Sequence, residues 1–312
     1  MKIGAIIRIC IWSLIAGLLT VAMVSGIVFD GEPRSILQGG YRYADVHTYS
    51  VGGTTMDAHA IESIDVEWIS GSIRIASTEN DNLIVRETAT SNTANALRWR
   101  VRDGELQIRY CKPRRLGTKN VSKDLEILVP SSMLSDSASL RSLSIENVSA
   151  QISLSNLEIN ESLDIESVSG PITIKNAMIR DIDLENVSGT VIIDNCRLEN
   201  MEVSTVSGKV TVNGEVHRID ISGISAQLHV ISTVCPELLS AETVSGRFSL
   251  TIPADSGFTV SMDSINGHFS APDFSVSAVG GGKYICGDGR AQFDFESVSG
   301  RVDISKFLPQ ND

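Results

Sequence analysis

The chain has 312 residues and a formal net charge of −12, with 38 acidic and 26 basic side chains. Five cysteines are too few for a disulfide-dense scaffold, and none lies in a CxxC or Cys/His spacing that suggests zinc. Few aromatic residues and many Ser, Ile and Val are typical of β-structure rather than helical packing. We expect no nucleic-acid partner and no resident cofactor.

The first 29 residues differ from the rest. Residues 9–29 carry no charge, and as a helix they would span roughly 31 Å, enough to cross a bilayer. Lys2 and Arg8 precede this run, whereas Asp30 and Glu32 follow it. The positive-inside rule therefore predicts a cytoplasmic tail at 1–8, a transmembrane helix at 9–29 and an extracytoplasmic remainder. The alternative is a cleaved signal peptide, although the apolar run is longer than is usual for one.

Residues 30–60 contain glycine pairs and no clear period, so we expect a stalk or loosely ordered segment there.

A repeat then begins. The apolar residue that opens a Val-Ser-Gly-like phrase recurs at intervals of 20, 19, 19, 18, 20 and 21 residues. Such even spacing is typical of a solenoid. The openings are Val148, Val168, Val187, Val206, Ile224, Val244 and Ile265, with further copies at Ile69 and Val298.

Side-chain alternation predicts the walls of each coil. Leu163, Ile165 and Ser167 share one face, but the next apolar set begins one residue out of phase at Val168. Side chains alternate strictly along a strand, so this slip predicts a corner at the Val-Ser-Gly phrase. Val and Gly would then point inward and Ser outward. We expect the serines to form a structural ladder, because no histidine accompanies them in register as a base.

A third wall completes the coil. Asparagine follows the second strand and tolerates the left-handed conformation that a corner can need, and a short apolar pair comes after it. The sequence thus predicts an all-β, parallel β-helix of about 20-residue coils over residues 61–308. The corner asparagines are Asn156, Asn176, Asn195 and Asn213; the pairs are Leu157/Ile159, Ala177/Ile179 and Cys196/Leu198.

Two insertions interrupt the coils. The first, at about 77–140, contains a predicted β-hairpin that turns at Asp103-Gly104, followed by a strand at 125–130. The second, at 271–291, is expected to be a Gly-rich loop. Its GGGK sequence lacks the spacing of a phosphate-binding loop. A disulfide between Cys111 and Cys286 in the two insertions is left open.

The predicted register places thirteen carboxylates in two columns on the outside of the first wall. Adjacent coils could supply oxygen ligands to Ca²⁺, with Asp164, Glu166, Asp183 and Glu185 as weak candidates, although no EF-hand loop is present. The simpler interpretation is a solvated face. The thirteen are Asp65, Glu67, Glu146, Asp164, Glu166, Asp183, Glu185, Glu202, Asp220, Glu242, Asp263, Asp294 and Glu296.

Basic residues gather in the first insertion. Nine lie between Arg98 and Lys123 against two acids, which gives +7 in 26 residues. We expect either a hairpin that folds back onto the acidic face or a surface for anionic lipid or wall polymer. The candidate surface comprises Arg98, Arg100, Arg102, Arg109, Arg114 and Arg115.

The ordering of these features resembles a bacterial family of membrane-anchored β-strand-repeat proteins, proposed as adhesins, whose function is unknown. The matching elements are SGSIRI after the membrane segment, LEILVPSS, the tandem xVSG coils and the final GDGRAQFDFESVSGRVDI. The resemblance implies a β-helical fold outside the membrane and supplies no catalytic residues.

These expectations favour an envelope-anchored interaction or scaffold protein without catalysis, in adhesion or envelope-stress sensing. Its partner would be an envelope protein, wall polymer or anionic lipid. The rival is a polysaccharide-active β-helix enzyme, a lyase or glycosidase, because such enzymes also cluster carboxylates on one wall. They use a few acids converging in a cleft, whereas the stripe predicted here is regular from end to end.

Overall fold

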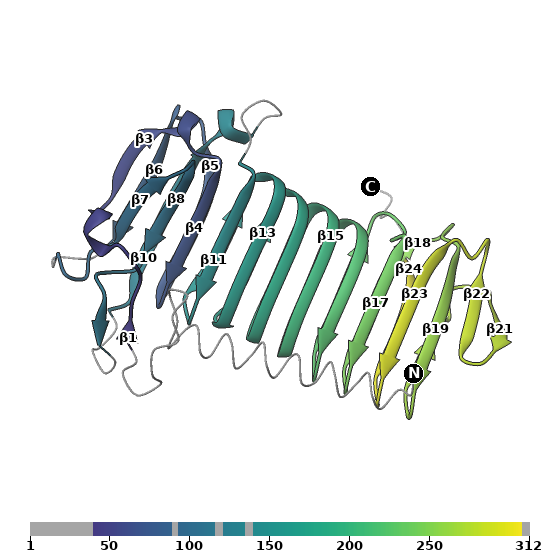
Figure 1. The fold of residues 1–312 in the computed structure, drawn as a ribbon. Coiled ribbons are helices and arrows are strands. Elements are labelled where there is room, and N and C mark those ends of the chain that lie inside the picture. The colour runs from purple at the N-terminus through teal and green to yellow at the C-terminus, as the bar shows by residue number, and fades with distance from the viewer. Residues whose placement is uncertain (1–39, 89–92, 116–120, 135–139, 308–312) are drawn as a thin grey trace. The chain divides into compact units, whose positions relative to one another are not determined.

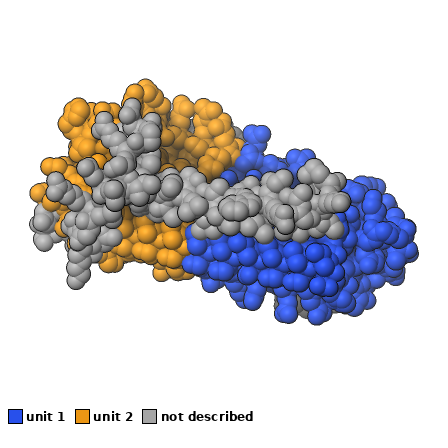
Figure 2. All heavy atoms as spheres, turned by 60° about the horizontal axis from the view of Figure 1, so that its bottom comes forward, with its two compact units in different colours: residues 1–16, 179–312 blue, residues 17–178 orange. Residues whose placement is uncertain are grey.

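The computed structural model describes residues 40–88, 93–115, 121–134 and 140–307. The predicted transmembrane helix at 9–29 lies outside them, and no helix within the described ranges is long and apolar enough to cross a membrane. The chain divides into two compact units, residues 17–178 (unit 2) and residues 1–16 with 179–312 (unit 1), coloured in Figure 2. The described parts of both units are all-β, as predicted, with only short 3-10 helices beside the strands.

Unit 2 is built from parallel coils with added strands at one end. On the first wall the pairing order is β7–β8–β4–β11–β13, and on the second β3–β6–β10–β5–β12–β14. Figure 1 shows β4, β8 and β11 side by side. The strands are β1 (Gly40–Tyr41), β2 (Ser50–Val51), β3 (Thr54–Asp57), β4 (Ser63–Trp68), β5 (Gly71–Thr78), β6 (Asn82–Thr88), β7 (Arg98–Arg102), β8 (Glu105–Arg109), β9 (Arg114–Arg115), β10 (Lys123–Pro130), β11 (Ser142–Asn147), β12 (Gln151–Ser155), β13 (Glu158–Ser169) and β14 (Ile172–Lys175), with 3-10 helices η2 (Val46–Thr48), η3 (Ala58–Ala60) and η4 (Ser131–Leu134).

The first insertion supplies those added strands. The predicted hairpin forms as β7 and β8, with positive φ at both Asp103 and Gly104, and the strand predicted at 125–130 is part of β10. β8 extends the first wall beside β4, and β10 extends the second wall beside β5. The insertion therefore covers the coil edge that β4 and β5 would otherwise leave unpaired.

The prediction of a loose stalk at 30–60 is wrong for its described part. β2 pairs with β7 and β3 pairs with β6. Tyr43 and Tyr49 are buried with their ring centroids 4.9 Å apart. Burial of these aromatic rings fixes the segment against the first insertion. The glycine pairs, on which the prediction of a stalk rested, carry no information about this packing.

Unit 1 is also built from parallel coils, but its last coils are not stacked in chain order. On the first wall the order is β15–β17–β23–β19–β22–β21, and on the second β15–β16–β18–β24–β20. The C-terminal coil thus lies between two coils that precede it in sequence. The strands are β15 (Met178–Gly223), β16 (Gln227–Ser232), β17 (Leu238–Thr243), β18 (Arg247–Pro253), β19 (Phe258–Ser264), β20 (His268–Ser270), β21 (Val276–Gly280), β22 (Lys283–Cys286), β23 (Ala291–Ser297) and β24 (Arg301–Phe307).

The second insertion is a hairpin rather than the expected Gly-rich loop. β21 and β22 pair antiparallel around Gly280, Gly281 and Gly282, all with positive φ, and β22 also pairs with β19. Glycine here supplies the turn. Cys286 at the end of β22 and Cys111 in unit 2 are both free thiols and buried, and Cys196 is buried as well.

The core follows the predicted alternation. Leu163, Ile165 and Ser167 on the first wall are buried, as are Ile172 and Ile174 on the second. The third-wall pairs are buried too. Left-handed φ occurs at Asn156, Asn176 and Asn195, but not at Asn213, whose amide instead donates to Asp194 Oδ1 at 3.1 Å.

The corner itself differs from the prediction in one respect. The opening valine is only half-buried in five phrases, and the polar residue just before it is buried; these residues are Asn147, Ser167, Asn186, Thr205 and Ser297. Ile265, which opens another phrase, is exposed. At Asn147, the side-chain oxygen accepts from the Ala150 amide at 2.9 Å and the side-chain amide donates to the Ala150 carbonyl at 2.7 Å. Ser297 likewise accepts from the Gly300 amide at 3.1 Å. These local turns satisfy backbone groups inside the coil.

The serine of each phrase links neighbouring coils. The backbone amides of Ser149, Ser169, Ser225, Ser245 and Ser299 donate to the carbonyl of the Val or Ile in the adjacent phrase; the distance from Ser169 to Val148, for example, is 2.9 Å. Ser149 also donates its hydroxyl to the Ile69 carbonyl at 2.9 Å. The phrase is thus a hydrogen-bonded corner ladder, which supports the structural role predicted for its serines.

Candidate interaction surfaces

The outward acidic columns form in register within each unit. In unit 2, Glu146 lies between Glu67 and Glu166 on adjacent strands, and Ser144 lies between Asp65 and Asp164. In unit 1, Glu296 lies between Glu242 and Asp263, an order set by the inserted C-terminal coil. The carboxylates are therefore spread at about one per coil in a column, roughly 4.8 Å apart.

The calcium hypothesis stays a prediction. Asp164 and Glu166 lie on β13, and Asp164 accepts a hydrogen bond from the Ser162 hydroxyl at 2.9 Å. Asp183 and Glu185 lie on β15 in unit 1. Within the described ranges, no group of three or more His, Cys, Asp or Glu side chains is arranged to hold a metal ion.

An arginine of the first insertion caps the acidic columns of unit 2. Arg109 on β8 lies 2.7 Å from Asp65 and 2.9 Å from Glu67, and its side chain is only 8% exposed. The Tyr41 hydroxyl donates to Glu67 at 3.4 Å from the other side. Burial raises the pKa of Glu67 to about 9, although Arg109 opposes the shift. Arg109 is therefore part of the packing rather than a free surface cation.

Next along this column, Glu146 has a raised pKa of about 7, caused first by burial and then by Glu166 and Asp65. Its Oε2 atom is buried without a hydrogen-bond partner. An unfolded Glu titrates near 4.3, so between about pH 4.3 and 7 the folded state holds the extra proton and stability falls as the pH rises.

We expect Glu146→Gln to raise the free energy of unfolding by about 1–2 kcal/mol at pH 8 and to leave it unchanged at pH 4. The gain is smaller than the full pKa shift implies, because the carboxylate is partly exposed. Urea unfolding at both pH values measures it. Glu161→Gln, at a surface carboxylate paired with Arg141 at 2.6 Å, is the control and should change stability by less than about 0.5 kcal/mol. A destabilised Glu146→Gln at pH 8 would contradict this assignment.

Other residues of the predicted basic surface make contacts within unit 2. Arg100 is 14% exposed at its side chain, donates to Gln107 at 2.7 Å and lies over the Tyr49 ring. Arg98 donates to the Thr93 carbonyl at 2.8 Å. The prediction of one basic surface is therefore wrong for Arg100 and Arg109, since burial and pairing withdraw both from solvent. Of the rest, Arg102 is exposed beside Asp103, Arg114 lies 5.4 Å from the Tyr110 ring centroid, and Arg115 is on β9.

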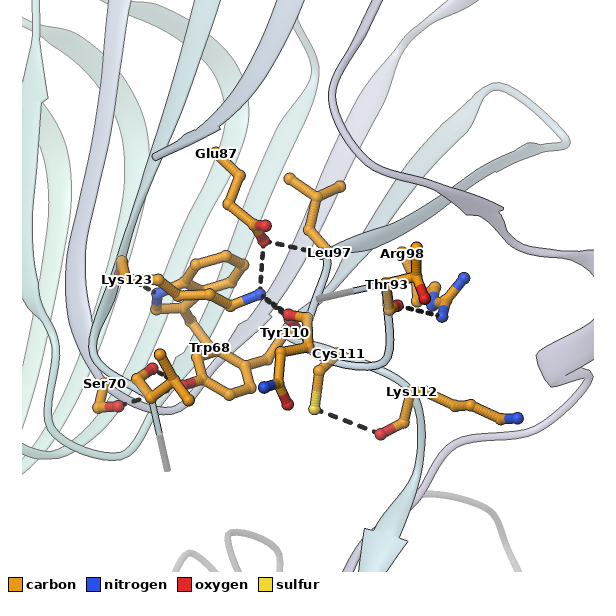
Figure 3. Close-up of polar contacts among 12 residues, drawn as sticks. Trp68, Ser70, Glu87, Thr93, Leu97, Arg98, Tyr110, Cys111, Lys112 and Lys123 are labelled. Carbon is orange, nitrogen blue, oxygen red and sulfur yellow. Dashed lines mark hydrogen bonds and ion pairs between the residues drawn. The ribbon is translucent and has the colours of Figure 1, made fainter. Parts of the chain in front are cut away.

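A lysine that sequence reasoning counted only as surface charge lies at the centre of a buried cluster (Figure 3). Lys123 Nζ contacts Glu87 at 2.5 Å, with side-chain exposures of 0% and 4%. It also donates to the carbonyls of Asn95, at 2.8 Å, and Tyr110. The Trp68 and Tyr110 ring centroids are 4.6 and 4.4 Å away. Burial lowers the pKa of Lys123, and Glu87 opposes that shift.

A family model described as Toastrack DUF4097 matches residues 61–305, most of the chain. The chain belongs to the Toastrack DUF4097 family.

Solved structures similar to this Toastrack chain share little sequence with it. A proposed adhesin from Parabacteroides distasonis is 14% identical, with 82% of this chain and 97% of that one covered and a TM-score of 0.45. A proposed lipid-binding protein from the same species is 13% identical, with 83% and 97% covered and a TM-score of 0.44. A proposed adhesin from Bacteroides fragilis is 13% identical, with 83% and 97% covered and a TM-score of 0.39. No curated protein matches the Toastrack chain.

Two features of this Toastrack chain were missed in the sequence. The Lys123–Glu87 pair joins residues 36 positions apart on β10 and β6, which no local pattern links. The polar residue that precedes each Val-Ser-Gly phrase was visible as a recurring Asn, Ser or Thr. An Asn, Ser or Thr three residues before a turn amide is a recognised hydrogen-bonding turn signal, and it could have located the corner.

Proposed function

We propose that this Toastrack chain is a non-catalytic interaction or scaffold protein of the cell envelope. It is anchored by a single transmembrane helix at 9–29, with residues 1–8 in the cytoplasm and a parallel β-helix outside. The charge asymmetry around the apolar run supports the anchor and its orientation. Adhesion and envelope-stress sensing are the processes that such a surface protein would serve.

The observation that carries the proposal is the regularity of the outer walls. Carboxylates recur once per coil along registered columns instead of converging on one point. Glycoside hydrolysis needs two carboxyl groups facing one bond, with space for a sugar between them. A repeated wall offers many equivalent contacts to an extended partner.

The raised pKa values of Glu67 and Glu146 favour the rival, a polysaccharide-active enzyme, because a general acid must hold its proton near neutral pH. At Glu146 burial and the neighbouring carboxylates Glu166 and Asp65 of the regular columns cause the shift. Glu67 is only 4% exposed, however, and Arg109 and Tyr41 both contact it. A glycosidic oxygen has no route to this carboxyl, so burial explains its pKa without catalysis.

Fractionation of cells that express the full chain tests the proposal. We expect it in the membrane fraction, resistant to high salt but released by detergent, and we expect a variant without residues 1–29 to leave that fraction. Purified chain should generate no new reducing or unsaturated ends from wall polysaccharide. Soluble full-length protein, or polymer cleavage that Glu67→Gln abolishes, would refute the proposal.

A further inference from the structure

The second wall of unit 1 carries a column of basic and amide side chains just after the corner glycine or alanine. Hydrogen-bonded register places its members on five consecutive coils, and all five are exposed. Four intervals of about 4.8 Å make the column roughly 19 Å long. In stacking order the column is Lys209, Gln227, Arg247, Arg301 and His268.

Only part of this positive charge is neutralised within the protein. Arg301 Nε contacts both carboxylate oxygens of Asp303 on its own strand, at 3.0 and 2.9 Å, and its side chain remains 51% exposed. Lys209 and Arg247 form no ion pair with any described residue. Arg247 and Arg301 are direct neighbours on β18 and β24.

Like charges one coil apart repel, so the pair of arginines opposes stability unless an anion lies over it. The rest of unit 1 does not need these cations for its fold, because they point away from the core. The first wall of the same unit is acidic at equivalent heights, with Glu242 and Glu296 on the coils of Arg247 and Arg301. The positive column therefore marks one wall of an otherwise acidic unit.

The neighbouring outward column is rich in hydroxyl groups. Thr211, His229, Ser249, Asp303 and Ser270 follow one another in register. No large hydrophobic side chain is exposed at either column on these five coils, within the part of the chain that the structure describes. Membrane-surface binding relies on apolar side chains that enter the headgroup region, so this wall fits a hydrophilic polymer better than a lipid surface.

We propose that this second-wall column binds a linear acidic polysaccharide. The polymer's carboxylates would lie against Lys209, Arg247 and Arg301, and its hydroxyl groups against Thr211, His229 and Ser249. Positive charges on three of five stacked coils along a straight line fit a polymer whose negative charges also recur along one axis. The inference rests on the proposed function, since it names the class of envelope partner for that role.

Calorimetry with the full chain in neutral detergent and an oligogalacturonate long enough to span the column tests the proposal. We expect binding that weakens in high salt, and no binding of a neutral dextran of equal length. Combining Lys209→Gln, Arg247→Gln and Arg301→Gln should weaken binding by about tenfold or more. Because the change relieves repulsion, that variant should be no less stable in urea than the parent.

The matched control combines Arg180→Gln, Arg197→Gln and Arg290→Gln, which remove the same charge from exposed positions of unit 1 outside the column. Its affinity should stay within about twofold of the parent chain. Equal weakening in both variants, dextran binding of equal strength, or no oligogalacturonate binding would overturn the proposal. Column-dependent binding to vesicles containing phosphatidylglycerol, without oligogalacturonate binding, would overturn it in favour of a membrane surface. The assay uses purified chain, so its failure is distinct from a failure of the localisation experiment.

Discussion

Replacing Lys123 with methionine is expected to lower the free energy of unfolding of unit 2 by about 3–5 kcal/mol. Methionine fills much of the same volume but leaves the Glu87 carboxylate buried without its cation. The Glu87 side chain is only 4% exposed. It also removes the donor to the Asn95 and Tyr110 carbonyls and the contact with two aromatic rings. Urea unfolding followed by tryptophan fluorescence measures the change, because Trp68 is part of the cluster.

A second substitution separates the unpaired charge from the lost packing. Glu87 also accepts a hydrogen bond from the Leu97 amide at 2.7 Å, which glutamine can retain. Adding Glu87→Gln to Lys123→Met should therefore recover more than half of the lost stability. Lys175→Met, at an exposed lysine of the same unit, should change stability by less than about 0.5 kcal/mol. A loss below about 1 kcal/mol for Lys123→Met would show that the pair is not important for stability.

Gly170→Ala is expected to destabilise unit 2 by about 2–5 kcal/mol, since strain and overpacking add. The backbone at Gly170 has φ +122°, which residues with a Cβ rarely adopt. A Cβ there would lie 2.4 Å from the Ala150 carbonyl oxygen in the corner of the adjacent coil. The Ala150 carbonyl accepts a hydrogen bond from the Asn147 side-chain amide at 2.7 Å, so it cannot move away without disturbing that bond.

Gly52→Ala provides the control for conformation alone. Gly52 lies in the same unit at φ +82°, but a Cβ there meets no atom within 4 Å. Its loss should be about 1–2 kcal/mol, from the left-handed backbone only. Thermal and urea unfolding of both variants give the comparison. If Gly170→Ala were no worse than Gly52→Ala, the close approach of coil corners would not be what requires glycine in the phrase.

The sequence predicts the walls because burial on each wall has a strict period of two. Leu163 and Ile165 point inward and Asp164 and Glu166 point outward, as alternation requires. The apolar side chain of Val168 does not predict that it is only half-buried. The buried place at the corner goes instead to the residue whose side chain can hydrogen-bond the backbone amides of the turn. Asn147 shows that a buried polar residue can hold that position.

The stacking order of the coils, and the burial and pairing of the basic residues, depend on contacts between segments that are distant in sequence. Nothing local to residues 291–307 indicates that their coil enters between β17 and β19. Arg109 and Arg100 look like surface cations in sequence, yet β8 places Arg109 between two carboxylates of β4. Arg247 and Arg301 lie far apart in the sequence, and only the pairing of β18 with β24 makes them neighbours in the basic column of unit 1.

Cysteine labelling on intact cells tests most directly the central claim, that the coils form a surface outside the cytoplasm. Ser149→Cys and Ser207→Cys introduce thiols at exposed corner positions of unit 2 and unit 1, in a parent chain that carries Cys235→Ser. Cys235 is replaced because it is only half-buried, whereas Cys111, Cys196 and Cys286 are buried. We predict that a membrane-impermeant maleimide labels both variants on intact cells and the parent chain only weakly. Labelling that appears only after the cells are lysed would contradict the account.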